Sequence, residues 1–152
     1  MKLNYAQAVA RYGAIVNGKW PDEAKWMVIY KTPDWFAKKV INSATQKPCD
    51  KIYINKDLMS MLNKALELVK ERNLCDELKT FDGCFHIRDV RGKQGTVSCH
   101  SYGTAIDLNA TENPLGGEVK FSNKLLQCFK EAGFTLGSEF VRKDGMHFSI
   151  GW

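Results

Sequence analysis

The sequence contains no Cys-x-x-Cys pair, no long apolar run and no dense cluster of Lys and Arg. Its five cysteines, Cys49, Cys75, Cys84, Cys99 and Cys128, are scattered and odd in number, which argues against a disulfide framework. No stretch approaches the roughly 20 apolar residues that are needed to cross a bilayer. We therefore expect the cysteines to be small buried side chains without a chemical role, and we expect no stable membrane insertion.

The chain also lacks internal repeats, low-complexity segments and linkers rich in Gly, Ser or Pro. The first residues, Met1 to Gln7, do not form the apolar core of a signal peptide. A length of 152 residues is that of one ordinary domain. We therefore predict a single domain over residues 1–152 that folds in a cytosol.

The charge is positive but dispersed. Lys and Arg number 22 against 17 Asp and Glu, which gives a net charge of +5 at pH 7. Such a charge favours contact with polyanions, including nucleic acid, acidic membranes and anionic cell-wall polymers. Because no basic run resembles a nucleic-acid-binding arm, we expect no nucleic-acid partner.

Apolar periodicity predicts both helices and strands. Apolar residues at three-and-four spacing predict helices, and short alternating segments predict strands. The predicted helices cover 5–12, 56–72 and 123–132, and the predicted strands cover 26–30, 51–54, 80–87, 96–99, 105–108, 140–141 and 146–150. This order predicts an α+β fold in which helices pack on one face of a small antiparallel sheet.

A His and an Asp stand close together around the strand predicted at 105–108. Alternation directs Ile106 and Leu108 to the core and Asp107 to the opposite face. His100 precedes Asp107 by seven residues, and Gly103 between them permits a tight turn. The imidazole and the carboxylate are therefore expected to approach a common point.

The last predicted strand repeats this pairing. Alternation over residues 146–150 directs every second side chain, from Met146 onward, into the core and turns His147 to the opposite face. Asp144 and Gly145 precede it and form a predicted turn, which would bring the Asp144 carboxylate round beside the imidazole.

Two His and one carboxylate form a common catalytic zinc set that leaves one tetrahedral position for water. A second carboxylate, for which Asp144 is the candidate, is then needed to move the proton of that water. Strand alternation directs Cys99 away from His100 and makes it a poor ligand. Each of these residues alone is more often structural, so the spacing by itself leaves both a metal site and a purely structural role open.

The ordered pattern resembles that of a known family. The pattern Ser-x-His-x-x-Gly-x-Ala-x-Asp at residues 98–107, followed by Asp-x-x-His at 144–147, resembles the signature of the D-alanyl-D-alanine carboxypeptidase family of zinc peptidases. That family includes vancomycin-resistance carboxypeptidases and dipeptidases and phage L-alanyl-D-glutamate endopeptidases. The resemblance extends from about Phe81 to the C-terminus.

The resemblance implies roles for individual residues. It implies that His100, Asp107 and His147 bind Zn²⁺ and that Asp144 is the catalytic acid and base. The dipeptidase branch carries Glu at the position of Asp144, whereas Asp is similar to the phage endopeptidase branch. Because Asp is one methylene shorter, its backbone must lie closer to the reacting water.

The resemblance also implies an arginine in the site. Arg88 is the predicted stabiliser of the oxyanion and Arg91 its close rival, while a surface ion pair remains open for one of the two. Ser98 and Tyr102 are predicted to line the substrate cleft. His86 has no counterpart in the family and is predicted to be structural.

On this resemblance, we expect a monomeric phage-type endolysin that cleaves the L-Ala–D-Glu bond of the peptidoglycan stem. It would accumulate in the host cytoplasm and act on the wall after the membrane is breached. Trp152 follows His147 by five residues, so no separate cell-wall-binding module is expected after the site. The alternatives are a carboxypeptidase or dipeptidase that removes D-Ala and a non-catalytic, zinc-stabilised wall-binding domain.

Overall fold

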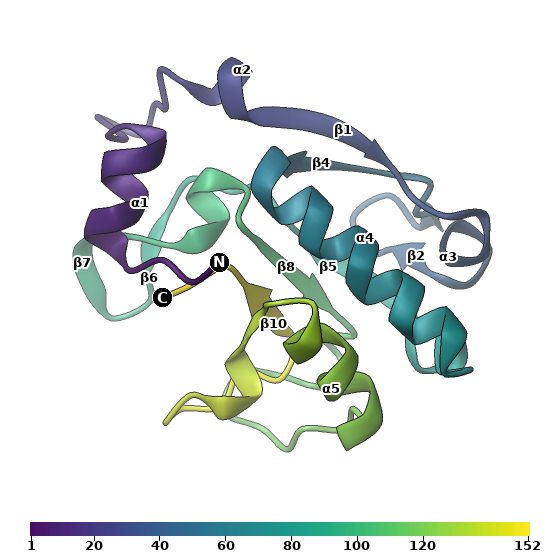
Figure 1. Cartoon of the computed structure of the whole chain (residues 1–152). Coiled ribbons are helices and arrows are strands. Elements are labelled where there is room, and N and C mark those ends of the chain that lie inside the picture. Colours follow the sequence, from purple (N-terminus) through teal and green to yellow (C-terminus); the bar gives the residue numbers. More distant parts are fainter.

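Helices and a central sheet enclose the main core in the computed structural model, which describes residues 1–152 (Figure 1). The helices are α1 (Tyr5–Tyr12), α2 (Glu23–Trp26), α3 (Asp34–Lys39), α4 (Lys56–Glu71) and α5 (Asn123–Glu131), and the short 3-10 helices are η1 (Cys75–Glu77), η2 (Cys99–Tyr102) and η3 (Gly137–Glu139). The strands are β1 (Met27–Lys31), β2 (Ile41–Asn42), β3 (Lys47–Pro48), β4 (Lys51–Asn55), β5 (Thr80–Gly83), β6 (Asp89–Val90), β7 (Lys93–Val97), β8 (Ala105–Leu108), β9 (Thr135–Leu136) and β10 (His147–Ser149).

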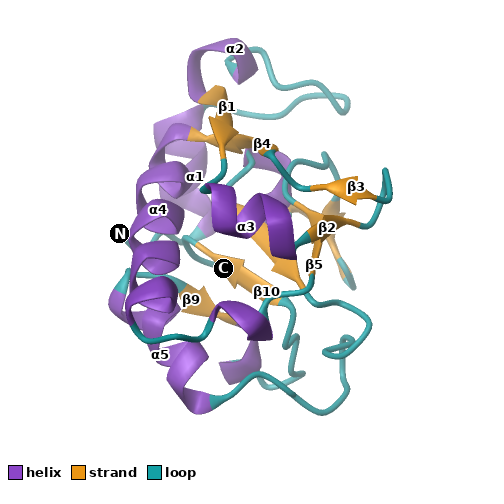
Figure 2. Ribbon diagram, turned by 90° about the vertical axis from the view of Figure 1, so that its right-hand side faces the viewer, coloured by secondary structure: helices purple, strands orange, loops and turns teal.

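The central sheet has six strands in the order β3-β2-β5-β8-β10-β9. Its pairs are antiparallel except for β2 and β5, which run parallel. Two further ribbons, β1–β4 and β6–β7, stand apart from this sheet. Helices α4 and α5 lie side by side against one face of it (Figures 1 and 2). The predicted α+β fold is confirmed, with one parallel pair in a sheet that was expected to be antiparallel throughout.

Helix α4 forms as its sequence pattern predicts. Asn55 caps it, since its side-chain oxygen accepts a hydrogen bond from the Asp57 amide at 2.9 Å. The residues at three-and-four spacing form its buried face: Leu58, Leu62, Ala65, Leu66 and Val69. This face packs into a core that also contains Phe129 of α5 and Phe148 of β10, whose ring centroids lie 4.3 Å apart. The core thereby fixes the inner face of β8 and β10.

The structure differs from the predicted strands at three places. The predicted strand 96–99 is not formed as such, because β7 ends at Val97 and Ser98 caps η2, which begins at Cys99. Strand β5 ends at Gly83, where its register with β8 shifts, and the following residues leave the sheet so that the His86 amide donates to the carbonyl of His100. Residues 140–141 form no strand, because η3 and the turn after it carry the chain around the end of the sheet. Hydrophobic pattern alone does not distinguish such short apolar segments from true strands.

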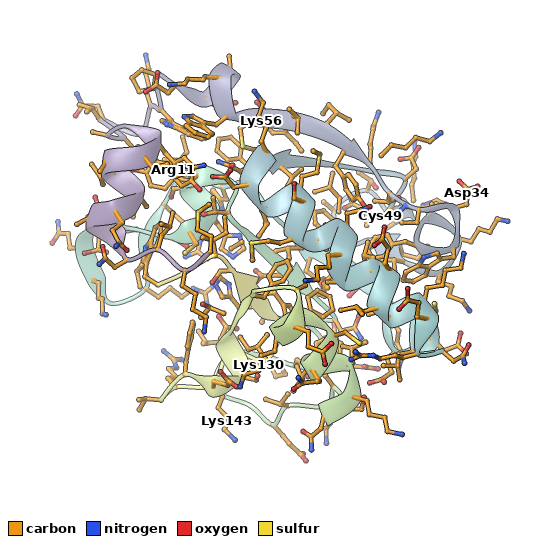
Figure 3. All side chains as sticks on the ribbon, viewed as in Figure 1. Arg11, Asp34, Cys49, Lys56, Lys130 and Lys143 are labelled. Atoms are coloured by element: carbon orange, nitrogen blue, oxygen red, sulfur yellow. The ribbon has the colours of Figure 1, made fainter.

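A second, smaller core lies under α1. It contains Ala8, Tyr12, Trp20, Met27 and Tyr102. An ion pair between Arg11 and Asp57 joins α1 to the start of α4, and Figure 3 shows Arg11 on that side of the helix. The two chain ends also meet, since Leu3 pairs with Gly151. The N-terminal segment is thus packed against the last residues of the chain.

The cysteines form no disulfide, as predicted. Four of them are buried and Cys75 is half-buried. None of the helices combines the length and apolar character that spanning a bilayer requires.

Candidate metal centre

Asp107 and His147 face each other across the centre of the sheet. They are direct register partners on the antiparallel strands β8 and β10. Their neighbours Ile106 and Phe148 point into the main core, so alternation turns Asp107 and His147 to the other face. His147 Nδ1 lies 3.2 Å from Asp107 Oδ1. Two separate chain segments thus meet as the sequence pattern predicts.

His100 reaches the same point from η2. The hydroxyl of Ser98 caps this short helix by accepting from the His100 amide at 3.3 Å, and Gly103 ends it with a left-handed φ of 63°. His100 Nδ1 lies 2.8 Å from the carbonyl oxygen of Cys84. A carbonyl only accepts hydrogen bonds, so the neutral imidazole carries its proton on Nδ1 and directs the lone pair of Nε2 towards Asp107 and His147.

The three side chains fit a tetrahedral metal ion. His100 Nε2 lies 3.2 Å from His147 Nδ1 and 3.3 Å from Asp107 Oδ2, and His147 Nδ1 lies 3.2 Å from the other carboxylate oxygen, Asp107 Oδ1. With one ligand atom taken from each residue, the three atoms lie within 4.8 Å of one another. Ligand atoms about 2.0 Å from a tetrahedral zinc ion are about 3.3 Å apart. The arrangement of His100, Asp107 and His147 can therefore hold a metal ion.

The electrostatics of Asp107 suit a ligand. Burial alone would raise the pKa of its carboxyl group, but the hydrogen bonds and charges of the His100 and His147 rings, when these are protonated, hold that pKa well below its usual range. Asp107 therefore remains an anion at neutral pH. Cys99 is different, because its thiol donates to the Trp152 carbonyl and burial raises its pKa to about 12. Its predicted exclusion from the site agrees with this geometry.

The Asp144 side chain lies near His100, Asp107 and His147, and one of its carboxylate oxygens lacks a hydrogen-bond partner. A turn places it, in which the His147 amide donates to the Asp144 carbonyl at 3.0 Å and the Asp144 amide donates to the Gly137 carbonyl at 2.8 Å. The side-chain atom Oδ1 is buried and makes no hydrogen bond. Desolvation raises the pKa of Asp144, while the nearby His147 lowers it and Asp107 adds repulsion. The pKa of this carboxyl group is raised on balance, which favours proton uptake.

A single pocket of about 680 Å³ opens onto this group. The predicted site residues that line it are Arg88, Arg91, Ser98, Asp107, Asp144 and His147. Neither arginine forms an ion pair within the chain. Arg91 lies near enough to oppose the raised pKa of Asp144, whereas an Nη atom of Arg88 donates to the Asp89 carbonyl. The structure thus brings both candidate arginines to the pocket, and the charge of Arg91 acts on the Asp144 carboxylate.

Tyr102 does not line this pocket, which corrects its prediction as a cleft residue. Its side chain is fully buried in the small core under α1, and its hydroxyl donates to the Gly13 carbonyl at 2.9 Å. Two residues after His100 in η2, the Tyr102 ring packs against Tyr12 and Trp20 of the small core instead. The side chain of His86 is exposed, and its backbone supports η2 through the bond to His100 described above.

The pocket has further wall residues that the sequence pattern does not indicate. They are Tyr5, Val90, Lys93, Thr96, Leu115, Phe140, Val141, Arg142, Met146 and Trp152. The ring of Phe140 lies 6.0 Å from that of His147. Alternation predicted that Met146 enters the core, which was wrong: Met146 precedes β10, is half-buried and lines the pocket. Trp152 could have been suspected from its nearness to His147 in sequence. Val90, Lys93 and Thr96 come from the β6–β7 ribbon, and the others come from loops and from the start of α1. The positions of all these segments depend on long-range packing.

Comparison with known proteins agrees with the geometry. Residues 91–150 match the family model described as D-alanyl-D-alanine carboxypeptidase. This segment contains His100, Asp107, Asp144 and His147 in order. No curated protein matches the sequence. The match and the His–Asp–His arrangement together support a metallopeptidase.

Proposed function

We propose that the protein is a zinc-dependent peptidoglycan endopeptidase that hydrolyses the L-Ala–D-Glu bond of the stem peptide. On this proposal it acts as a phage-type endolysin, which reaches the wall from the host cytoplasm once the membrane is breached. The observation that carries the proposal is the unpartnered carboxylate of Asp144 beside the group formed by His100, Asp107 and His147. A metal-ligand set with an adjoining free base is the arrangement that peptide hydrolysis requires.

The side chains divide the reaction between them. A zinc ion held by His100, Asp107 and His147 would polarise the scissile carbonyl and lower the pKa of a water molecule to about 7. Asp144 accepts the proton of the attacking water and returns it to the leaving amine. The guanidinium of Arg91 or Arg88 stabilises the negative charge that develops on the carbonyl oxygen.

The backbone around Asp144 supports the endopeptidase over the dipeptidase. An Asp base must lie closer to the water than a Glu base, because its side chain is one methylene shorter. The turn is drawn tightly against Gly137, so that a Cβ atom on that glycine would overlap the Asp144 carbonyl and lie 2.9 Å from His147 Cβ. This contact holds the backbone of Asp144 beside His147, which is the position from which a short side chain would act on the water.

The charge of the pocket also suits an acidic peptide. Arg88, Arg91, Lys93 and Arg142 line it, and no ion pair within the chain neutralises them. The stem peptide has a D-Glu carboxylate next to the proposed scissile bond, which these cations would attract. A peptide that ends in D-Ala also has a carboxylate, so D-Ala carboxypeptidase activity is the second candidate.

Digestion of purified peptidoglycan tests the assignment. We expect the zinc-loaded protein to produce new N-terminal D-Glu, detected by mass spectrometry after N-terminal labelling, and a chelator to stop the reaction. Release of D-Ala without new D-Glu termini would instead establish the carboxypeptidase. Binding to the wall with neither product would establish a non-catalytic wall-binding domain.

A substitution at Gly137 tests the positioning of Asp144. We expect Gly137→Ala to lower kcat by roughly 100-fold, since a displacement of about 1 Å in a catalytic group has that effect. KM should change little, because Gly137 does not line the pocket. Ser138→Ala, in the same short helix, is the matched control and should retain wild-type kcat. Equal kcat values for both variants would show that the close contact at Gly137 has no catalytic importance.

A further inference from the structure

Two aromatic side chains from opposite ends of the chain form part of the pocket wall. Tyr5 and Trp152 both line the pocket that contains Asp107 and His147, and their ring centroids lie 6.0 Å apart. Both residues lie outside the segment 91–150 that matches the family model. This wall is therefore a feature of this chain's own N- and C-terminal residues.

The packing of the chain ends fixes this aromatic wall. The Leu3 amide donates to the Ile150 carbonyl at 3.3 Å, and Gly151 lies so close to Leu3 that any Cβ would overlap its carbonyl oxygen. Reciprocal hydrogen bonds between Asn4 and Gln7 then start helix α1 at Tyr5. Figure 1 accordingly shows the two termini side by side at the base of α1. These backbone contacts hold Tyr5 and Trp152 in fixed positions in the folded chain.

The exposed surface of the wall combines ring faces with free hydroxyl groups. The indole N–H of Trp152 donates a hydrogen bond to the Val97 carbonyl at 2.8 Å. The part of the Trp152 ring that faces the pocket is therefore carbon. The hydroxyl groups of Tyr5 and Thr96 make no hydrogen bond within the chain. The hydroxyl of Ser98 accepts from the His100 amide and keeps its own proton to donate. All four residues line the same pocket.

We propose that Tyr5 and Trp152 form a subsite for an N-acetylhexosamine ring, namely the sugar that bears the stem peptide. A pyranose ring has an apolar C–H face that stacks on aromatic carbon and an edge of hydroxyl and amide groups that bond to hydroxyls. This inference rests on the proposed function, because in peptidoglycan the L-Ala residue of the stem is joined by an amide bond to the lactyl group of that sugar. A carboxylate would find its partners among the pocket's arginines, and an aliphatic side chain would leave the free hydroxyls unbonded.

Binding of a neutral sugar tests the subsite apart from catalysis. The probe is N,N′-diacetylchitobiose, which has no carboxylate and no peptide bond of the stem. We expect it to shift the indole N–H resonance of Trp152, identified by its absence in Trp152→Phe, in a saturable titration of the full chain. Tyr5→Leu should weaken this binding by about 3- to 10-fold, the range expected for the loss of one aromatic stacking contact.

The leucine keeps apolar bulk and removes only the ring and its hydroxyl, so unchanged binding would overturn the stacking proposal. Tyr53→Ala removes a partly exposed aromatic residue outside the pocket and is the control that should bind normally. Thermal melts of both variants establish that they are folded.

Hydrolysis provides the second measurement. The wild-type protein should have a KM for disaccharide-linked stem peptide several-fold below its KM for the free peptide. Tyr5→Leu should bring these two KM values close to each other, with kcat little changed. Equal KM values in the wild type, together with no Trp152 shift, would overturn the subsite and leave the endopeptidase intact. If the protein binds chitobiose but hydrolyses neither substrate, the sugar subsite would be supported and the endopeptidase assignment would be overturned.

Discussion

Asp144→Ala is expected to lower kcat for peptide hydrolysis by about 100- to 10,000-fold, the contribution typical of a general acid–base residue. Zinc content should be unchanged, because Asp144 is outside the His–Asp–His group. The free energy of unfolding should be equal or higher, since the variant removes a desolvated carboxylate whose buried oxygen has no partner. Steady-state kinetics, metal analysis and thermal melts on the same preparation measure these three quantities.

Asp144→Asn separates charge from shape. The amide has nearly the same size as the carboxylate but accepts no proton at neutral pH, so it should lose as much activity as the alanine variant. Asp76→Asn is the matched control, because Asp76 is exposed and distant in the fold from the pocket. Full activity of Asp144→Asn would assign the base to another group.

Much of the fold could be predicted because its elements obey local rules. Helix α4 has a capping residue and a continuous apolar face, and β8 and β10 alternate between core and site. The end of β5 at Gly83 and the parallel pairing of β2 with β5 could not be predicted. These features depend on which strands meet in space, and a short strand carries no sequence mark of its partner.

The candidate site likewise has some residues that the sequence predicted and others that it did not. His100, Asp107, Asp144 and His147 belong to two short segments. Their spacing alone left a metal site and a structural role open, and the resemblance of the ordered pattern to a zinc peptidase family predicted that the segments meet. The prediction for Tyr102 was wrong, because its position follows from the geometry of η2 and from the small core that the N-terminal helix supplies. The pocket wall depends on loops and chain ends, so residues such as Tyr5 and Phe140 could not be identified from pattern.

His147→Ala should abolish zinc binding and, with it, hydrolysis. Outer partners of a ligand already contribute about 10- to 100-fold to metal affinity, so loss of a ligand itself should exceed that effect. His86→Ala is the matched control among the three histidines of the chain, because its side chain is exposed and lies outside the group. It should keep wild-type zinc content, measured by metal analysis after dialysis, and wild-type kcat.

Thermal stability distinguishes loss of the metal from damage to the fold. A ligand that binds only the folded state stabilises it by about 4 kcal/mol at a free concentration 1,000-fold above its Kd. Zinc should therefore raise the Tm of the wild type and of His86→Ala, and a chelator should reverse the increase. His147→Ala should have a Tm that responds to neither, close to that of the chelated wild type. A zinc-dependent rise of normal size in His147→Ala would contradict its role as a ligand, since the remaining His100 and Asp107 would then suffice to hold the ion.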